Sequence, residues 1–333
     1  MGGMTRLMQC QNKTEWDDYI LDNGGHPLQL WGWGDLKAAH GWSANRLFFY
    51  NDNDDLTGAV QILIKKLPWP LKSLVYVPRG PVVAIENRDD LLSELKNFVK
   101  KTFHSVAITV EPDEEKFRTK TDWNTSSNHI LPARTIILDL NKSESDLLSV
   151  MAKKTRQYIR KSAAENIKIK MIRDVSELEK CLEVYDQTAK RAGFALHDRQ
   201  YYYDVFDKLG DYSPVFAAYA DNQPVAFLWL AISADTAYEL YGGMNDLGQQ
   251  LRANYMLKWY AIRKCKEWGL IRYDFGGLLD GGITTFKKGW ASEETELAGT
   301  FDCQLSVFYG LWTKGLPMAK KIIRKFKSVF NKK

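Results

Sequence analysis

The residues whose types and spacing best suit chemistry are Phe286, Lys287 and Lys288, a few positions after the run 273–277. An aromatic face beside fixed positive charge suits an anionic or carbonyl-bearing ligand, because a lysine ammonium donates charge-assisted hydrogen bonds to oxygen. A surface loop with hydrated lysines accounts for the same residues, since most charged side chains lie in solvent. The local chemistry leaves both interpretations open.

A short strand followed by a loop would position these side chains. Residues 271–275 alternate between apolar and polar types, as a strand does, and Gly276 and Gly277 then permit backbone angles that other residues resist. The sequence therefore predicts that a strand opens onto a loop that carries Phe286 and Lys287.

Two further groups place positive charge where a ligand could use it. Three tryptophans, at positions 31, 33 and 42, accompany Lys37 and Arg46. They suit stacking and pairing with a sugar or nucleotide diphosphate, and they equally suit core packing with a charged rim. The basic cluster at 153–161 suits phosphate binding or a hydrated helix face.

The order of predicted elements repeats along the chain. In each half a hairpin is followed by a strand, a helix and a closing strand. The first set is 47–50 with 58–64, then 74–78, 89–102 and 105–110; the second is 215–219 with 225–232, then 238–243, 254–268 and 271–275. Such self-similarity predicts two copies of one α/β fold.

Helices and one strand are predicted outside the repeated elements. A helix near 16–21 precedes the first set. A strand at 135–140 lies between the sets, and one helix, capped at 143–146, runs on through the basic cluster. Two more helices, at 175–191 and 199–209, precede the second set.

Composition indicates a globular protein with room for two domains. The chain has 333 residues, 45% of them hydrophobic and 13% aromatic, which argues against disorder. Its net charge of +5 favours neither a nucleic-acid nor a membrane partner by itself. Four widely spaced cysteines, without a CxxC pair or a histidine at ligand spacing, predict buried thiols and no metal site.

Residues 1–14 lack the apolar core of a signal peptide, and no segment approaches the roughly 20 apolar residues of a spanning helix. We therefore expect a cytoplasmic protein. The basic tail, residues 314–333, holds eight lysines and arginines and no acidic residue. Its apolar residues fall on one side of a predicted helix, which fits contact with an anionic bilayer, docking on the first domain, or contact with RNA.

Taken in order, several motifs resemble the Fem family, the peptidyltransferases that use aminoacyl-tRNA to form peptidoglycan bridges. The resemblance spans nearly the whole chain. It rests on Gln29…Trp31-Gly32…Lys37 with Gly41-Trp42 and Arg46, on Tyr76-Val77-Pro78-Arg79-Gly80-Pro81, on Lys153-Lys154-Thr155-Arg156…Ile159-Arg160-Lys161, on Arg199…Tyr203, on Tyr241-Gly242-Gly243, and on Tyr273-Asp274-Phe275-Gly276-Gly277…Phe286-Lys287-Lys288-Gly289.

The resemblance implies an α/β fold of two tandem acetyltransferase-like (GNAT) domains, with a chain that returns to the first domain at its end. Boundaries would fall at 1–140 plus 305–333 for the first domain and 141–304 for the second. It implies transfer of an amino acid from aminoacyl-tRNA to an amine of a cell-wall precursor. We expect a monomer without a cofactor or metal. The acceptor would be UDP-MurNAc-pentapeptide or lipid II, at the inner face of the membrane.

Site residues are carried over from the family by position. Lys37, Arg199 and Tyr203 would bind the diphosphate of the precursor. Tyr76, Arg79 and Tyr241 would line the groove for its muropeptide. Phe286 and Lys287 match the family's loop at the transfer site, and Asp302 lies near a position that is often acidic in the family.

Two other functions compete with this one. The GNAT-like pattern also fits an acyl-CoA N-acyltransferase, although residues 249–254 lack the second glycine of a pyrophosphate-binding loop. A non-catalytic protein that binds a membrane or RNA through the basic tail is the third possibility. The stretch 175–209 holds no long heptad run, so no long coiled-coil arm is expected.

Overall fold

The computed structural model describes residues 5–278, 282–291 and 293–315, which form two compact units. The first unit contains residues up to 13, 41–131 and those from 298 onward; the second contains 14–40 and 132–297. The helix predicted in the basic tail lies almost entirely outside the described residues. The domain boundaries expected near 140 and 304 stay a prediction. The compact units divide the chain near 131 and 297, and the second unit also includes residues 14–40.

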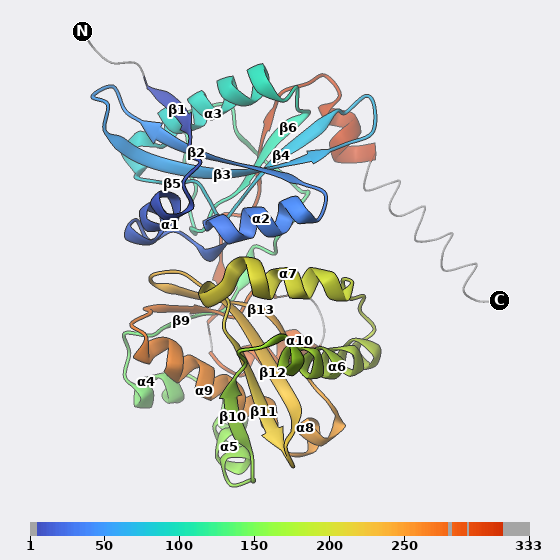
Figure 1. Ribbon diagram of the computed structural model, residues 1–333. Helices are drawn as coiled ribbons and strands as arrows, with labels where there is room; N and C mark the ends of the chain where they lie inside the picture. Colours follow the sequence, from blue (N-terminus) through green and yellow to red (C-terminus); the bar gives the residue numbers. More distant parts are fainter. Residues whose placement is uncertain (1–4, 279–281, 292, 316–333) are drawn as a thin grey trace, which may run out of the picture. The chain divides into compact units, whose positions relative to one another are not determined.

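A mixed sheet forms the centre of the first unit, in the order β1-β2-β3-β4-β6-β16-β7 (Figure 1). Only β4 and β6 pair in parallel among the pairs of this sheet. Its strands are β1 (Arg6–Gln9), β2 (Ser43–Tyr50), β3 (Leu56–Lys66), β4 (Ser73–Pro78), β6 (Ala107–Glu111), β7 (Asn124–Thr125) and β16 (Phe301–Gln304), with β5 (Val82–Val83) beside β3. The hairpin predicted at 47–64 is therefore confirmed.

Helix α3 (Arg88–Thr102) covers this sheet with the apolar face that its periodicity predicts. Leu91, Leu92, Leu95 and Val99 are fully buried against strand residues. Asp89 and Asp90 lie in the first turn, and Lys100 and Lys101 in the last, so their charges complement the helix dipole.

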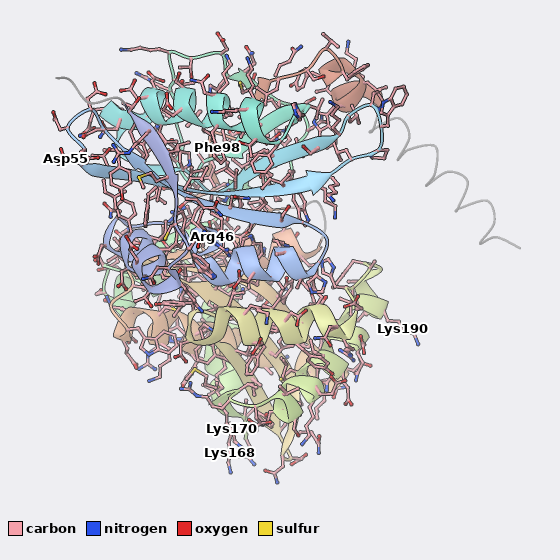
Figure 2. All side chains as sticks on the ribbon, turned by 45° about the horizontal axis from the view of Figure 1, so that its top comes forward. Arg46, Asp55, Phe98, Lys168, Lys170 and Lys190 are labelled. Carbon is pink, nitrogen blue, oxygen red and sulfur yellow. The ribbon has the colours of Figure 1, made fainter. Side chains whose placement is uncertain are left out.

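The second unit has a sheet in the order β10-β11-β12-β13-β14-β9, in which β13 and β14 form the parallel pair. Its strands are β9 (Ile137–Asp139), β10 (Lys168–Met171), β11 (Val215–Ala220), β12 (Gln223–Ile232), β13 (Thr236–Met244) and β14 (Arg272–Asp274). At the edge, β10 exposes Lys168 and Lys170, whose side chains point outward in Figure 2. Edge lysines discourage pairing with another chain's strand.

Side chains of β12 alternate between two covered faces. Leu228 and Leu230 join a core with α5 (Lys153–Ala163) and α9 (Ala253–Glu267). Trp229 lies on the opposite face, within ring contact of Tyr202 in α7 (Arg199–Leu209). Helix α6 (Val175–Ala192) packs on that face as well. The remaining helices of the unit are α1 (Lys13–Asp22), α2 (Trp31–Ala39), α4 (Glu144–Ser149), α8 (Asp246–Gln250) and α10 (Gly282–Lys288).

The single helix predicted across 143–161 is wrong, because the chain forms α4 and α5 with a break between them. The Arg156 guanidinium donates to the carbonyls of Leu148, Ser149 and Met151 at 2.6–3.2 Å and so satisfies the end of α4. This member of the basic cluster therefore serves the fold. The predicted strand at 135–140 is also divided, between β8 (Arg134–Thr135) and β9, which belong to different sheets.

Other expectations are met. All four cysteines are buried free thiols. The longest helix in the described ranges, α6, has 18 residues, so these ranges hold no long coiled-coil arm. Across the same ranges, none of the helices combines the length and apolarity needed to cross a membrane.

Candidate functional site

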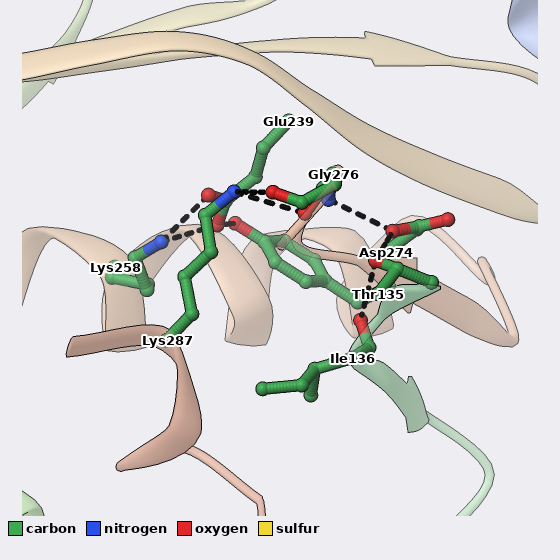
Figure 3. Close-up of polar contacts among 9 residues, drawn as sticks. Thr135, Ile136, Glu239, Lys258, Asp274, Gly276 and Lys287 are labelled. Carbon is green, nitrogen blue, oxygen red and sulfur yellow. Dashed lines mark hydrogen bonds and ion pairs between the residues drawn. The ribbon is translucent and has the colours of Figure 1, made fainter. Parts of the chain in front are cut away.

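Lys287 lies on a helix, so the loop predicted around it is wrong. Helix α10 carries Phe286 and Lys287 and follows β14 in the chain. The Lys287 Nζ donates to the carbonyl oxygens of Gly276 at 2.9 Å and Gly277 at 3.2 Å (Figure 3). Lys288 is exposed instead and pairs with Glu294 at 2.5 Å. The hydrated-lysine interpretation therefore holds for Lys288 and fails for Lys287.

The surroundings of Lys287 alter its proton affinity. Burial lowers the pKa of Lys287 from its ordinary 10.5, while the carboxylates of Glu239 and Asp274 act to raise it. The structure thus places a partly buried ammonium beside two backbone carbonyls and two nearby carboxylates.

A buried ion pair lies beside Lys287. Lys258 of α9 donates to both carboxylate oxygens of Glu239 of β13, at 2.5 and 2.7 Å, and both side chains are almost entirely buried (Figure 3). The Tyr273 hydroxyl donates to the same carboxylate at 2.8 Å. Burial lowers the pKa of Lys258, and Glu239 opposes this effect. Lys258 and Tyr273 together hold the carboxylate in one position.

Aromatic rings enclose this charge pair. The Lys258 ammonium lies 4.7 Å from the Phe275 ring centroid and 5.2 Å from that of Phe286. Phe286 also contacts Tyr255 at 5.1 Å and Trp290 at 6.0 Å. Phe286 is therefore fixed by packing, and it links α10 to the ion pair.

The turn after β14 presents the two carbonyls that Lys287 uses. Asp274 is fully buried and accepts hydrogen bonds from the Thr135 hydroxyl at 2.5 Å and the Gly276 amide at 2.8 Å. Gly276 has a φ of 65°, and a Cβ there would lie 2.8 Å from the Glu239 carbonyl oxygen. Only glycine fits this turn, as the sequence predicted.

Lys37 belongs to a second cluster in the same unit. It lies on α2, donates to the Tyr201 hydroxyl at 2.9 Å and sits 4.4 Å from the centroid of the Trp33 ring. Tyr201 also shares a hydrogen bond with Tyr241, whose pKa is raised by burial and by Tyr201. The structure thus joins two predicted residues, Lys37 and Tyr241, through Tyr201, which the sequence analysis missed.

Arg199 and Tyr203 are joined through acidic residues. The Arg199 guanidinium pairs with Asp186 at 2.5 Å and Glu179 at 3.4 Å, and the Tyr203 hydroxyl donates to Glu179. Both side chains are half-buried on α7, one turn apart. An anionic ligand of Arg199 would therefore replace or share carboxylate partners.

Tyr76 and Arg79 lie in the first unit, at the end of β4. The Tyr76 hydroxyl donates to Glu111 at 2.5 Å, and Arg79 is buried with a φ of 50°. In the same unit, the Asp302 carboxylate accepts from Thr109 at 2.5 Å and from the Tyr309 hydroxyl at 2.8 Å.

Two family models match separate parts of this chain. Residues 12–130 match the FemAB family and residues 149–288 match the acetyltransferase (GNAT) domain. The lipid II:glycine glycyltransferase of Staphylococcus aureus strain MRSA252 is 23% identical over an alignment of 387 positions, which covers 88% of this chain and 91% of the relative. Together, the FemAB match and this relative support membership of the Fem family. The resemblance noted in the sequence is therefore confirmed.

Solved structures show that this chain has the tandem GNAT fold. The crystal structure of FemX superposes with a TM-score of 0.80 at 20% identity and covers 90% of this chain and 97% of FemX. A tandem GNAT protein from the clavulanic acid biosynthesis pathway superposes with a TM-score of 0.52 at 10% identity, covering 90% and 98%. The predicted fold class is confirmed.

The buried Glu239–Lys258 ion pair of this chain was not predicted. Glu239 is the one charged residue in a strand otherwise composed of apolar and small polar residues, and Lys258 interrupts the apolar face of α9. A charge at such positions signals a buried partner. That signal was present in the sequence, but it does not identify which residues pair.

Proposed function

We propose that this Fem protein is a transferase that moves an amino acid from aminoacyl-tRNA to an amine on the stem peptide of a peptidoglycan precursor. The acceptor is UDP-MurNAc-pentapeptide or lipid II, and the product is an interpeptide bridge. The observation that carries the proposal is the partly buried Lys287 ammonium beside Phe286, held at the end of β14. The name of the staphylococcal relatives, lipid II:glycine glycyltransferase, supports the same chemistry.

The reaction needs charge stabilisation more than a nucleophile from the protein. The acceptor amine attacks the ester carbonyl of the aminoacyl-tRNA, a C–N bond forms and the carbonyl oxygen becomes an oxyanion. The C–O bond to the ribose then breaks, and the amine's proton ends on the ribose oxygen. Because the tRNA ester is already activated, no covalent enzyme intermediate is required. Lys287 would stabilise the oxyanion by rotating one N–H away from the Gly277 carbonyl.

Phe286 would complete this site as a positioning surface. Its ring is packed against Tyr255 and Trp290, so its orientation is set before a substrate arrives. We assign its partly exposed ring to the terminal adenosine of the tRNA, because bases stack on aromatic side chains.

Lys37 would bind the diphosphate of the precursor. Its ammonium is oriented by Tyr201 and Trp33. Arg199 and Tyr203 would join it by exchanging Glu179 and Asp186 for phosphate oxygens, which is favourable because a diphosphate presents more acceptors to a guanidinium. Tyr241, Tyr76 and Arg79 would contact the muropeptide. We further propose that the protein acts as a monomer in the cytoplasm, where charged tRNA is found.

An acyl-CoA-dependent reaction is the second candidate, because residues 149–288 match a GNAT domain. In this chain α8 and its cap at Asn245 occupy the segment before α9, and α9 begins after Arg252 with a φ of 56°. Calorimetric titration with CoA separates the two functions. Micromolar CoA affinity would favour this second candidate.

The direct experiment supplies a pool of charged tRNA bearing labelled amino acids, with UDP-MurNAc-pentapeptide and lipid II as parallel acceptors. We expect the labelled amino acid to appear on at least one acceptor. In a control reaction without tRNA, neither acceptor should become labelled. Lys37→Met should weaken binding of UDP-MurNAc-pentapeptide by about 10–100-fold, the value of a charged hydrogen bond. Lys208→Met, an exposed lysine of α7 paired with Asp207, is the matched control. No label on either acceptor, with competent substrates, would reject the proposal.

A further inference from the structure

One surface of the first unit exposes large apolar side chains. Trp69 in the loop between β3 and β4 is 89% exposed, as is Val307 after β16, and Leu311 and Phe308 are 50% and 41% exposed. Single exposed apolar residues are common on proteins, but several on adjoining segments mark an interaction site.

These side chains belong to one surface because their segments share a small core. Leu71 and Leu74 pack with Val106 and Ala107, and Leu67, Tyr309 and Trp312 cover this cluster. The amide of Leu305 also donates to the Val106 carbonyl at 3.1 Å. The loop is closed by the Leu67 amide, which donates to the Lys72 carbonyl at 2.8 Å, so Trp69 lies at its tip. We call residues 66–72 and 306–314 the apolar platform.

The charged residues that the segments of the platform expose are all basic. Lys66, Lys72 and Lys314 are exposed, and neither 65–74 nor 303–315 contains an acidic residue. The sequence continues from the platform into residues 316–333, which add seven lysines and arginines and no acidic residue. Any partner of this surface must therefore combine apolar character with negative charge.

We propose that the apolar platform docks the protein on an anionic lipid bilayer. An indole at a loop tip is suited to the headgroup region, where aromatic side chains concentrate. Val307 and Leu311 would be buried among acyl chains, whereas an RNA backbone has no apolar surface to bury them. A lipid bilayer therefore fits this surface better than RNA does. Surrounding lysines each add attraction to anionic headgroups. The inference goes beyond the proposed transfer, because it concerns a surface of the first unit and no reacting group.

Vesicle sedimentation tests the proposal with the full chain. Wild-type protein should bind vesicles containing phosphatidylglycerol and only weakly bind pure phosphatidylcholine. Trp69→Ser with Val307→Ser should weaken binding to the anionic vesicles by about tenfold or more, the effect of removing one to two inserted side chains. Ile85→Ser is the matched control, because Ile85 is 75% exposed in the same unit but outside the platform. That variant should bind as wild type does.

Two results would overturn the proposal. The platform would have no role in docking if the double variant and wild type bound vesicles equally. Stronger vesicle binding after truncation at Gly315 would show that residues 316–333, rather than lipid, cover the platform. Transfer to the soluble UDP-MurNAc-pentapeptide should be unchanged in the double variant. Loss of vesicle binding and loss of the transfer activity are therefore separately observable. If the platform binds RNA instead of lipid, the same two substitutions should abolish RNA binding and leave vesicle binding intact.

Discussion

Two adjacent lysines of α10 show how much a residue's role depends on its surroundings. Lys287 donates to two backbone carbonyls in a partly desolvated site, whereas Lys288 lies in solvent and pairs with Glu294. The sequence made Lys287 a candidate through its resemblance to a family and its aromatic neighbour. It did not reveal the Glu239–Lys258 pair, because that contact joins β13 to α9 across many residues.

The charge of Lys287 should appear in the pH dependence of transfer. If the ammonium stabilises the oxyanion, kcat/KM must fall as pH rises through the Lys287 pKa, which burial holds below 10.5. Glu239 acts to raise that pKa, so Glu239→Gln should move the falling limb to lower pH. The other charged neighbours, Asp274 and Lys258, remain in place. A pH–rate profile of both proteins measures the shift.

The control for this prediction concerns stability. Glu239→Gln leaves Lys258 buried without its carboxylate, which costs about 3–5 kcal/mol. Adding Lys258→Met removes the second charge and should restore much of the lost stability in urea unfolding. The role given to Glu239 would be contradicted if the falling limb of the pH–rate profile stayed in place, or moved to higher pH, in folded Glu239→Gln protein.

At the scale of elements, the sequence predicted the long amphipathic helices and missed the short ones. Helix α2 contains Gly32 and Gly34, and α10 begins at Gly282 and includes two threonines, so intrinsic propensity does not favour a helix in either segment. Their helical form depends on tertiary contacts. The break between α4 and α5 likewise depends on Arg156, whose contacts periodicity cannot show.

Close packing of α2 on α7 should depend on Gly32. A Cβ at this position would lie 2.2 Å from the Lys208 carbonyl oxygen, which is backbone and cannot rotate away. Gly32→Ala should therefore destabilise the fold by about 1–3 kcal/mol and weaken binding of UDP-MurNAc-pentapeptide, because Lys37 and Tyr201 lie on these two helices. Urea unfolding and calorimetry measure the two effects. Gly310→Ala, which has open space around it, should change neither.

At the scale of the molecule, each sheet is completed by a strand from a distant part of the chain. β9, which precedes the other strands of the six-stranded sheet, pairs with β14. β16, which follows all of these strands in the chain, pairs with β6 of the first unit. The repeat of hairpin, strand, helix and closing strand was visible in the sequence because it is local. The pairings of β9 and β16 were not, because short strands carry little pattern and their partners are remote.

The return of β16 should make the first unit depend on the end of the chain. Truncation at Gly299 removes β16 and Thr300, and with them hydrogen bonds to Thr109 and Glu111. We expect a loss of at least about 3 kcal/mol in the first unit, because each buried group left unsatisfied costs about 1–3 kcal/mol. Truncation at Gly315 keeps these hydrogen bonds, so its unfolding midpoint should be the higher of the two. Equal midpoints for the two truncations would contradict this dependence.

The central claim is that Lys287 promotes aminoacyl transfer to a cell-wall precursor, and single-turnover transfer from labelled aminoacyl-tRNA tests it most directly. Wild type, Lys287→Met and Lys288→Met should be compared on the acceptor that wild type uses. We predict that Lys287→Met lowers the rate by about 10²–10³-fold, the effect of removing one oxyanion donor, while Lys288→Met stays within about twofold of wild type. Equal rates for the folded Lys287→Met protein and wild type would contradict the account.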